Sequence, residues 1–175
     1  MPGFDIQSFK SNFDGGARAY LFYYYPNIPN SLLGEKISYL VKTATLPGST
    51  LEEHTAAWQG NTFKFSGKHT FEDWTINFNV DPDAKIRIDF ENWQRQKIHD
   101  PVSNKYGAIT EYMRDQQLQL LGYDGEYVLE VTLYNAWPKT IGALSLDYAS
   151  SDTLAFDVTF AYTHYTMKRQ DNATL

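Results

Sequence analysis

The side chains best able to do chemistry in this sequence are four histidines and one pair of adjacent carboxylates. The histidines show neither HxH nor HxxxH spacing, so a metal site is not indicated. They are His54, His69, His99 and His164. Glu52 and Glu53 could act as an acid–base pair. In a chain of net charge −6, adjacent carboxylates are more often simply solvated, and we favour that interpretation.

Motifs of catalysis are incomplete or missing. Gly60 to His69 resembles a phosphate-binding loop, but it has too many residues between its glycines and no Ser or Thr after Lys68. The sequence contains no GxSxG motif. Asp73 and Trp74 together could bind a sugar, with the carboxylate beside an aromatic ring on which the sugar stacks. The alternation that follows favours another interpretation, in which Asp73 ends a turn and Trp74 is the first core residue of a strand. The sequence therefore predicts no enzyme, no cofactor and no metal.

Composition points toward assembly with other proteins. The chain of 175 residues suits one domain, and 42% of its residues are hydrophobic. It has 13 Tyr and 11 Phe, and Tyr is enriched where protein surfaces meet. The net charge of −6 argues against a surface that grips nucleic acid. There is no cysteine and no leader pattern at the N-terminus, which favours a protein made in the cytosol.

The clearest elements lie between positions 73 and 97. Apolar residues alternate with polar ones from 73 to 80, which predicts a strand with Trp74 and Phe78 on its buried face. After Asp81-Pro82 the spacing lengthens to that of a helix. Its apolar stripe includes Ile86, Phe90 and Trp93, with Lys97 one turn further on. We expect Trp74, Phe78, Phe90 and Trp93 to form the core between sheet and helix.

The remaining pattern predicts a mostly antiparallel β domain with that one helix. Expected strands cover 17–25, 36–46, 126–134 (ended by Trp137-Pro138), 144–146 and 154–165, and 109–121 reads as either a helix or a strand. Residues 1–16 read as a mobile arm, 47–66 as a long loop that returns as a hairpin near Gly60, and 166–175 as a tail. The whole chain, 1–175, reads as a single domain.

Four stretches carry a resemblance that covers residues 17 to 165. They are YLVKTATLPG (39–48), GKHTFEDWTINF (67–78), FENWQ (90–94) and WPKTIGALSLDYASSDTLAFDVTFAY (137–162). In this order they are similar to the tail tube proteins of contractile-tailed bacteriophages related to T4. The tyrosines that end the first strand, Tyr23 to Tyr25, and the extended tail depart from that pattern.

The resemblance implies an antiparallel β-sandwich or half-barrel protomer with a flanking helix. Six protomers would close into a β-barrel ring, and rings would stack into a tube through which DNA passes without specific binding. Sheath, baseplate and tape-measure proteins would be the partners. The protein would be found in the virion tail, and in the host cytoplasm during assembly.

With this resemblance, the polar strand faces become candidates for the wall of the channel, because a water-filled barrel needs a polar lining. The expected lining residues are Thr75, Asn77, Asn79, Glu130, Thr132, Asp157, Thr159 and Thr163. The long loop is expected to join one ring to the next, with Trp58 becoming buried there. Its expected contact residues are Leu51, Glu52, Glu53, His54 and Trp58.

Two alternatives stay open at this point. The first is another assembly protein of the same fold, such as a tube initiator, a baseplate protein or a secretion-system tube. The second is a carbohydrate-binding β-sandwich that uses exposed aromatic side chains. Only a true tube protein is expected to grow long tubes when purified, whereas the second alternative predicts a monomer that binds glycans.

Overall fold

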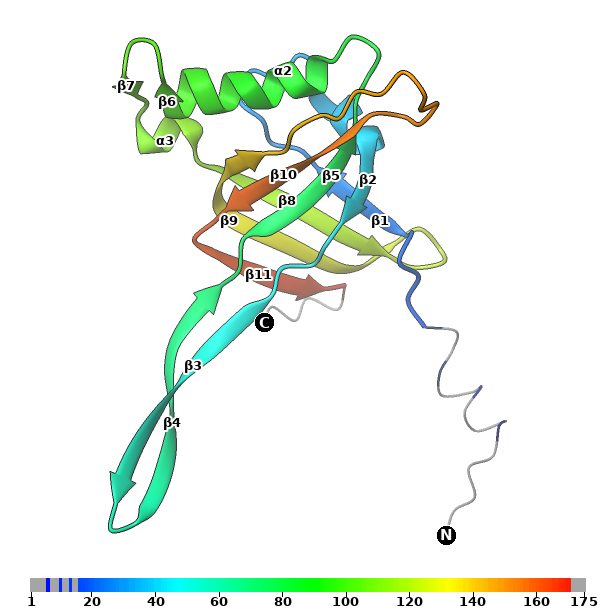
Figure 1. Cartoon of the computed structure of the whole chain (residues 1–175). Coiled ribbons are helices and arrows are strands. Elements are labelled where there is room, and N and C mark those ends of the chain that lie inside the picture. The colour runs from blue at the N-terminus through cyan, green and yellow to red at the C-terminus, as the bar shows by residue number, and fades with distance from the viewer. Residues whose placement is uncertain (1–5, 7–9, 11–12, 14–15, 171–175) are drawn as a thin grey trace.

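The computed structural model describes residues 6, 10, 13 and 16–170. The chain folds into two antiparallel layers that share one long strand (Figure 1). The first layer, here called the β8 layer, contains β1 (Phe22–Tyr25), β8 (Arg114–Leu121), the first half of β9 (Tyr127–Ile141) and β11 (His164–Arg169). The second, the β5 layer, contains the end of β9, β10 (Ala155–Ala161), β5 (Trp74–Asn79) and β2 (Val41–Ala44). The mostly antiparallel β fold predicted from sequence is confirmed.

Strand β9 passes from one layer to the other at Asn135. This residue has a left-handed backbone (φ 55°), and the Asp115 carboxylate accepts its N–H at 2.9 Å. The expectation that Trp137-Pro138 ends the strand is wrong, because β9 continues to Ile141. Pro138 lies opposite Phe160, where the register between β9 and β10 shifts. A proline is tolerated at such an irregularity because its missing N–H interrupts no regular ladder.

The core fills the space between the two layers and the helix. Every second residue of β5 is fully buried, namely Trp74, Ile76 and Phe78. The Tyr24 ring from the opposite layer lies 5.9 Å from Trp74 and 6.0 Å from Phe78, centre to centre. Because both layers bury one face in this cluster, their other faces point outward in opposite directions.

The helical stripe closes one end of the sandwich. Helix α2 (Lys85–Asn92) runs on into a π-helical turn (Trp93–Ile98), and together they bury Ile86, Phe90 and Trp93 completely. The Phe90 ring lies 5.2 Å from Phe78, and the Trp93 ring 6.0 Å from Phe160. Asp81 caps the start of α2 by accepting hydrogen bonds from the backbone N–H groups of Lys85 and Ile86. The four predicted core residues thus lie where the layers meet the helix.

One buried carboxylate ties the early chain to α2. Asp89, only 2% exposed, accepts hydrogen bonds from the Ser31 hydroxyl and the Leu32 N–H. A second buried tie uses Gln116, whose side-chain carbonyl accepts from the Tyr24 hydroxyl at 2.5 Å. These bonds satisfy polar groups that would otherwise be costly to bury.

Several expected elements differ from the structure. Residues 34–40 form a 3-10 helix (Gly34–Leu40) with Ile37 buried, so the strand expected over 36–46 shrinks to β2. Residues 109–121 contain both a short helix, α3 (Ile109–Tyr112), and β8. Residues 142–154 form no strand. The last strand is really two, and β11 includes residues 166–169 of the expected tail. The expected arm is almost entirely outside the described residues.

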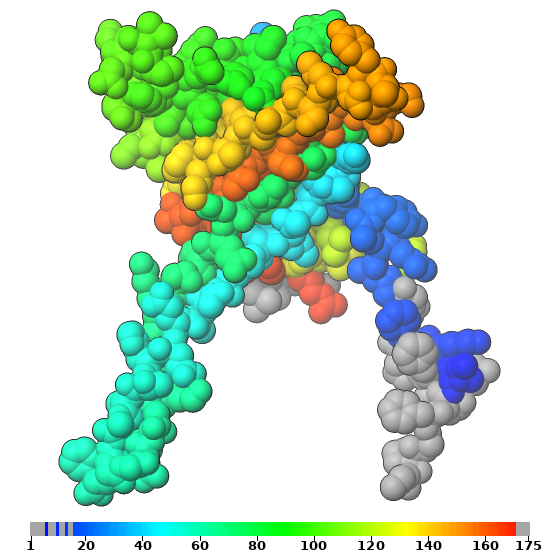
Figure 2. All heavy atoms as spheres, viewed as in Figure 1, coloured from blue at the N-terminus to red at the C-terminus, as the bar shows by residue number. Residues whose placement is uncertain are grey.

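Two hairpins stand out from the body in opposite directions (Figures 1 and 2). The long one joins β3 (Ser49–Trp58) to β4 (Asn61–Phe71). The short one joins β6 (His99–Asp100) to β7 (Lys105–Tyr106) and lies at one end of α2. The region expected to be a long loop is therefore an extended ribbon.

Candidate functional site

The outward face of the β5 layer carries a ladder of small polar pairs. Asn77 lies opposite Asp157, and its amide donates to that carboxylate at 2.8 Å. Thr75 lies opposite Thr159, with their hydroxyl oxygens 3.1 Å apart. Neither β5 nor β10 contains a lysine or arginine. On β5 and β10 this face is thus polar with a single carboxylate, while the flanking strands of the layer add two exposed lysines, Lys42 and Lys139, the second paired with Asp73 at 2.6 Å.

The structure brings five of the eight expected lining residues onto this face. They are Thr75, Asn77, Asn79, Asp157 and Thr159. Glu130 and Thr132 lie on the outward face of the β8 layer instead, where Glu130 accepts a hydrogen bond from Gln119 at 2.8 Å. Thr163 is exposed in the turn between β10 and β11. The expectation that all eight share one wall is therefore wrong for the protomer, because the two layers face opposite ways.

The long hairpin has two chemically different faces. Cross-strand pairing places His54 beside Phe65, Ala56 beside Phe63, and Trp58 beside Asn61 on one face. We call this set the aromatic face. The other face carries Thr55 beside Lys64 and Ala57 beside Thr62, with Glu53 bonded to Lys64 at 3.1 Å.

The base of the hairpin packs against the apolar interior of the body through Phe71, which pairs with Ser49 and so belongs to the face opposite the aromatic one. At the base of the hairpin, the Phe71 ring lies 6.1 Å from Tyr162 and 5.6 Å from Tyr165, both of which pack against the core. Further out nothing in the described chain covers the aromatic face, and Trp58, Phe63 and Phe65 are 69%, 52% and 59% exposed. Trp58 is thus exposed in the single chain, and its burial between rings stays a prediction. Leu51, Glu52, Glu53 and His54 are exposed as well.

Two backbone features build the hairpin. Gln59 and Gly60 both have positive φ (47° and 81°), which is the two-residue turn that matches the twist of the strands. Gly67 lies opposite the bulge between Leu51 and Glu53, where a β-carbon would come within 2.9 Å of the His54 ring. The aromatic residues of β4 were missed at the sequence level, although the alternation Phe63–Phe65 in NTFKFSG was the available signal.

The exposed long hairpin and its aromatic face indicate a protein that associates with other chains. A two-stranded ribbon on its own is at best marginally stable in water, and large exposed apolar patches mark interaction sites. Among the described residues, no three His, Cys, Asp or Glu side chains are placed to hold a metal ion. In the same part of the chain no helix is long and apolar enough to span a membrane. The geometry is that of a subunit of a larger assembly.

Comparison with solved structures identifies the fold. The chain is similar to the tube-terminating cap of the anti-feeding prophage, with a TM-score of 0.66, 17% identity, and coverage of 87% of this chain and 91% of that one. It is also similar to a chain of the sheath–tube complex of an extracellular contractile injection system, with a TM-score of 0.61, 18% identity, and coverage of 91% and 97%. These likenesses show a shared fold.

Sequence comparison gives the family. The chain matches the family of phage tail tube proteins over residues 8–168, and it belongs to that family. It is 26% identical to tail tube protein gp19 of Enterobacteria phage T4 over 137 residues, 77% of this chain and 84% of the T4 protein. It is 34% identical to the tail tube protein of Serratia phage KSP90 over 116 residues, 65% of this chain and 64% of that protein. The protein is a structural component of a phage tail tube and not an enzyme.

Proposed function

We propose that six copies of this chain close into a ring whose inner wall is the outward face of the β5 layer, and that rings stack into a channel for genome delivery. The observation that carries this proposal is the ladder formed by Asn77 with Asp157 and Thr75 with Thr159. The two central strands, β5 and β10, pair these side chains and carry no cation, so they give phosphates little to bind.

The dimensions are compatible with a passing duplex. Four strands from each of six chains make 6 × 4 = 24 strands, and at a spacing of ~4.8 Å and a tilt of ~40° such a barrel is about 48 Å across its backbone. Side chains narrow the bore to roughly 40 Å, against roughly 20 Å for a duplex. Six chains of charge −6 also give the ring a charge of 6 × −6 = −36, which disfavours adhesion of DNA.

Stacking is assigned to the long hairpin. Its aromatic face, with Trp58, Phe63 and Phe65, is uncovered in the single chain and would be buried against the adjacent ring. The β8 layer, with Glu130 and Thr132, would then face outward. A contractile sheath is the expected outer partner, because one similar chain comes from a sheath–tube complex. The baseplate and a tape-measure protein would be partners at the end and inside the tube.

Electron microscopy of the purified protein tests this function. Long tubes of stacked six-membered rings are the expected result. Single rings that do not propagate would favour a cap or initiator, which the likeness to a tube-terminating cap makes the specific alternative. Protein that stays monomeric at high concentration would overturn the proposal.

A further inference from the structure

Two exposed segments at one end of the molecule have no role in the function proposed so far. One is the short hairpin of residues 99–107, which we call the knob. The other is the irregular loop of residues 142–154, which we call the acidic loop. They lie near opposite ends of α2, on the side of the body away from the long hairpin (Figure 1). Figure 2 shows both as protrusions on the surface.

The knob is held in shape by its own hydrogen bonds. The Asp100 carboxylate accepts from the N–H groups of Val102 and Ser103, at 3.0 and 3.3 Å, and from the Ser103 hydroxyl. The His99 ring lies 4.3 Å from the Tyr106 ring, and its Nε2 is 3.0 Å from the Asn104 side chain. This rigid turn presents Val102, 93% exposed, and Tyr106, 76% exposed.

The segment that carries the knob is rich in cations, of which Arg95 is paired with Glu91 at 3.0 Å. Residues 94–114 contain four cations, Arg95, Lys97, Lys105 and Arg114, against the anions Asp100 and Glu111, so 4 − 2 = +2. Within the described part of the chain Lys105, on the knob itself, forms no ion pair. Its charge is available to a partner.

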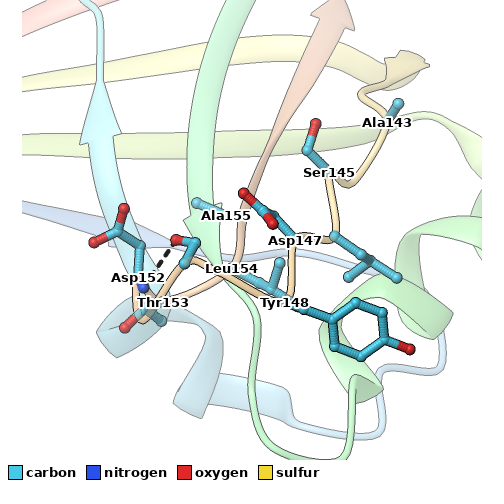
Figure 3. A pocket seen from close by; sticks show the side chains of 10 residues that line it. Ala143, Ser145, Asp147, Tyr148, Asp152, Thr153, Leu154 and Ala155 are labelled. Atoms are coloured by element: carbon cyan, nitrogen blue, oxygen red, sulfur yellow. Dashed lines mark hydrogen bonds between the residues drawn. The ribbon is translucent and has the colours of Figure 1, made fainter.

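The acidic loop encloses a hollow of about 670 Å³. Figure 3 shows the loop curving around it, with Asp147 on one arm, Asp152 on the other, and Tyr148 pointing away. Neither carboxylate forms an ion pair with a described residue, and residues 142–154 contain no cation. Leu146 is 79% exposed and Tyr148 fully exposed. The hollow thus offers two unpaired charges beside an apolar rim.

We propose that the knob of one copy docks into the acidic loop of its neighbour within the ring. This inference rests on the ring proposed above. Lys105 would lie between Asp147 and Asp152, and Val102 and Tyr106 would cover the exposed apolar rim. The two surfaces are different, complementary and placed apart on one chain. A contact of this kind is heterologous, and a cyclic ring of six requires it.

Thiol cross-linking tests the contact directly, because the chain has no cysteine of its own. A chain with Val102→Cys and Leu146→Cys, treated with a short bismaleimide, should give a ladder up to the hexamer on a denaturing gel. A chain with Val102→Cys and Tyr123→Cys, where Tyr123 is an exposed residue of the β8–β9 turn, serves as the control and should give no ladder. Rings visible by electron microscopy without the ladder would overturn this contact and leave the ring standing. Absence of rings would overturn both.

Charge exchange provides a second measurement. Lys105→Asp alone, and Asp147→Lys with Asp152→Lys, should each lower the assembled fraction several-fold at fixed concentration, with melting temperatures of the protomer unchanged. Combining the three substitutions should restore assembly because the attraction is re-formed with its signs reversed. Unchanged assembly in the single-sided variants, or no recovery in the combined one, would contradict the docking of Lys105 between the two carboxylates.

Discussion

The ladder on the β5 layer matters because its side chains pair with one another across β5 and β10. Asp157 accepts a hydrogen bond from Asn77, and the hydroxyls of Thr159 and Thr75 bond to each other, so the donors of these two pairs are engaged within the sheet. Phosphate binding needs free donors or cations, and neither β5 nor β10 supplies a cation. These side chains therefore favour DNA that slides along the face over DNA that binds to it.

Asp157→Lys is the sharpest test at this scale. The substitution changes each chain by +2 and a ring by 6 × 2 = +12, while the exposed position keeps the fold intact apart from one lost hydrogen bond of ~1 kcal/mol. Tubes should still assemble but retain DNA, and the retention should fall steeply with added salt. DNA binding by assembled tubes at 50 and 200 mM salt measures this effect.

Asp124→Lys is the matched control, because Asp124 is an exposed carboxylate in the β8–β9 turn and away from the ladder. It makes the same charge change and should leave DNA retention near the wild-type level. Equal retention by both variants would show that net charge, and not the wall, governs adhesion.

A buried tyrosine predicts a loss of stability at alkaline pH. Burial raises the pKa of Tyr24 well above its ordinary value of 10.0, and burial first, then nearby charges, raise the pKa of Tyr162 to about 12. A raised folded-state pKa gives stability that is complete below pH 10 and is lost as the pH rises further. Urea unfolding between pH 7 and 11 should show this loss. Tyr24→Phe should cost ~1 kcal/mol at pH 7 and decline less steeply above pH 10, whereas parallel profiles would rule out Tyr24 as a cause.

At the scale of elements, the contact between α2 and the β5 layer dominates the stability of the protomer. Trp93 is fully buried, packs against Phe160, and donates its indole N–H to the Tyr112 carbonyl at 2.8 Å. Its removal would leave both a cavity and an unpaired carbonyl.

Trp93→Ala should therefore destabilise the protomer by ~3–5 kcal/mol, a fall in melting temperature on the order of 10 °C. Trp58→Ala is the control, since its side chain is 69% exposed and its loss should change the melting temperature of the protomer little. Thermal unfolding of both variants under conditions that prevent assembly measures the difference. An unaltered melting temperature for Trp93→Ala would contradict its place in the core.

The long hairpin is the element assigned to stacking. Phe63→Ser with Phe65→Ser removes most of the aromatic face, whereas Thr55→Ser with Thr62→Ser changes the opposite face as a control. The first pair should leave rings that do not stack, and the second should leave tubes of normal length. Sedimentation and electron microscopy distinguish these states. Normal tubes from the aromatic-face variant would assign the hairpin another role.

The sequence predicted those elements whose periodicity is produced by burial. Strand β5 and helix α2 were anticipated because Trp74, Phe78, Phe90 and Trp93 all face one core. The alternation of apolar and polar residues across 36–46 wrongly predicted a strand over the whole range. It does not reflect a buried face there, because Tyr39 is 80% exposed and only Ile37 of the 3-10 helix is buried. The prediction that all the polar strand faces line one wall also failed in part. Alternation shows that Thr132 faces away from the core, but it does not show to which layer its strand belongs.

At the scale of the whole molecule, surfaces of different character point in different directions. The long hairpin extends to one side, the knob and acidic loop lie on the other, and the two polar faces belong to opposite layers. This arrangement suits a subunit that meets neighbours above, below and beside it. The polar face of the β5 layer, however, needs none of these neighbours to cover it.

A cryo-electron-microscopy reconstruction of the assembled tube would show directly which face of the chain lines the channel. We predict six chains per ring, with Thr75, Asn77, Asp157 and Thr159 of every chain lining the channel, and Glu130 and Thr132 on the outside. A tube in which Asp157 lies on the outer surface, or is buried between protomers, would contradict this prediction.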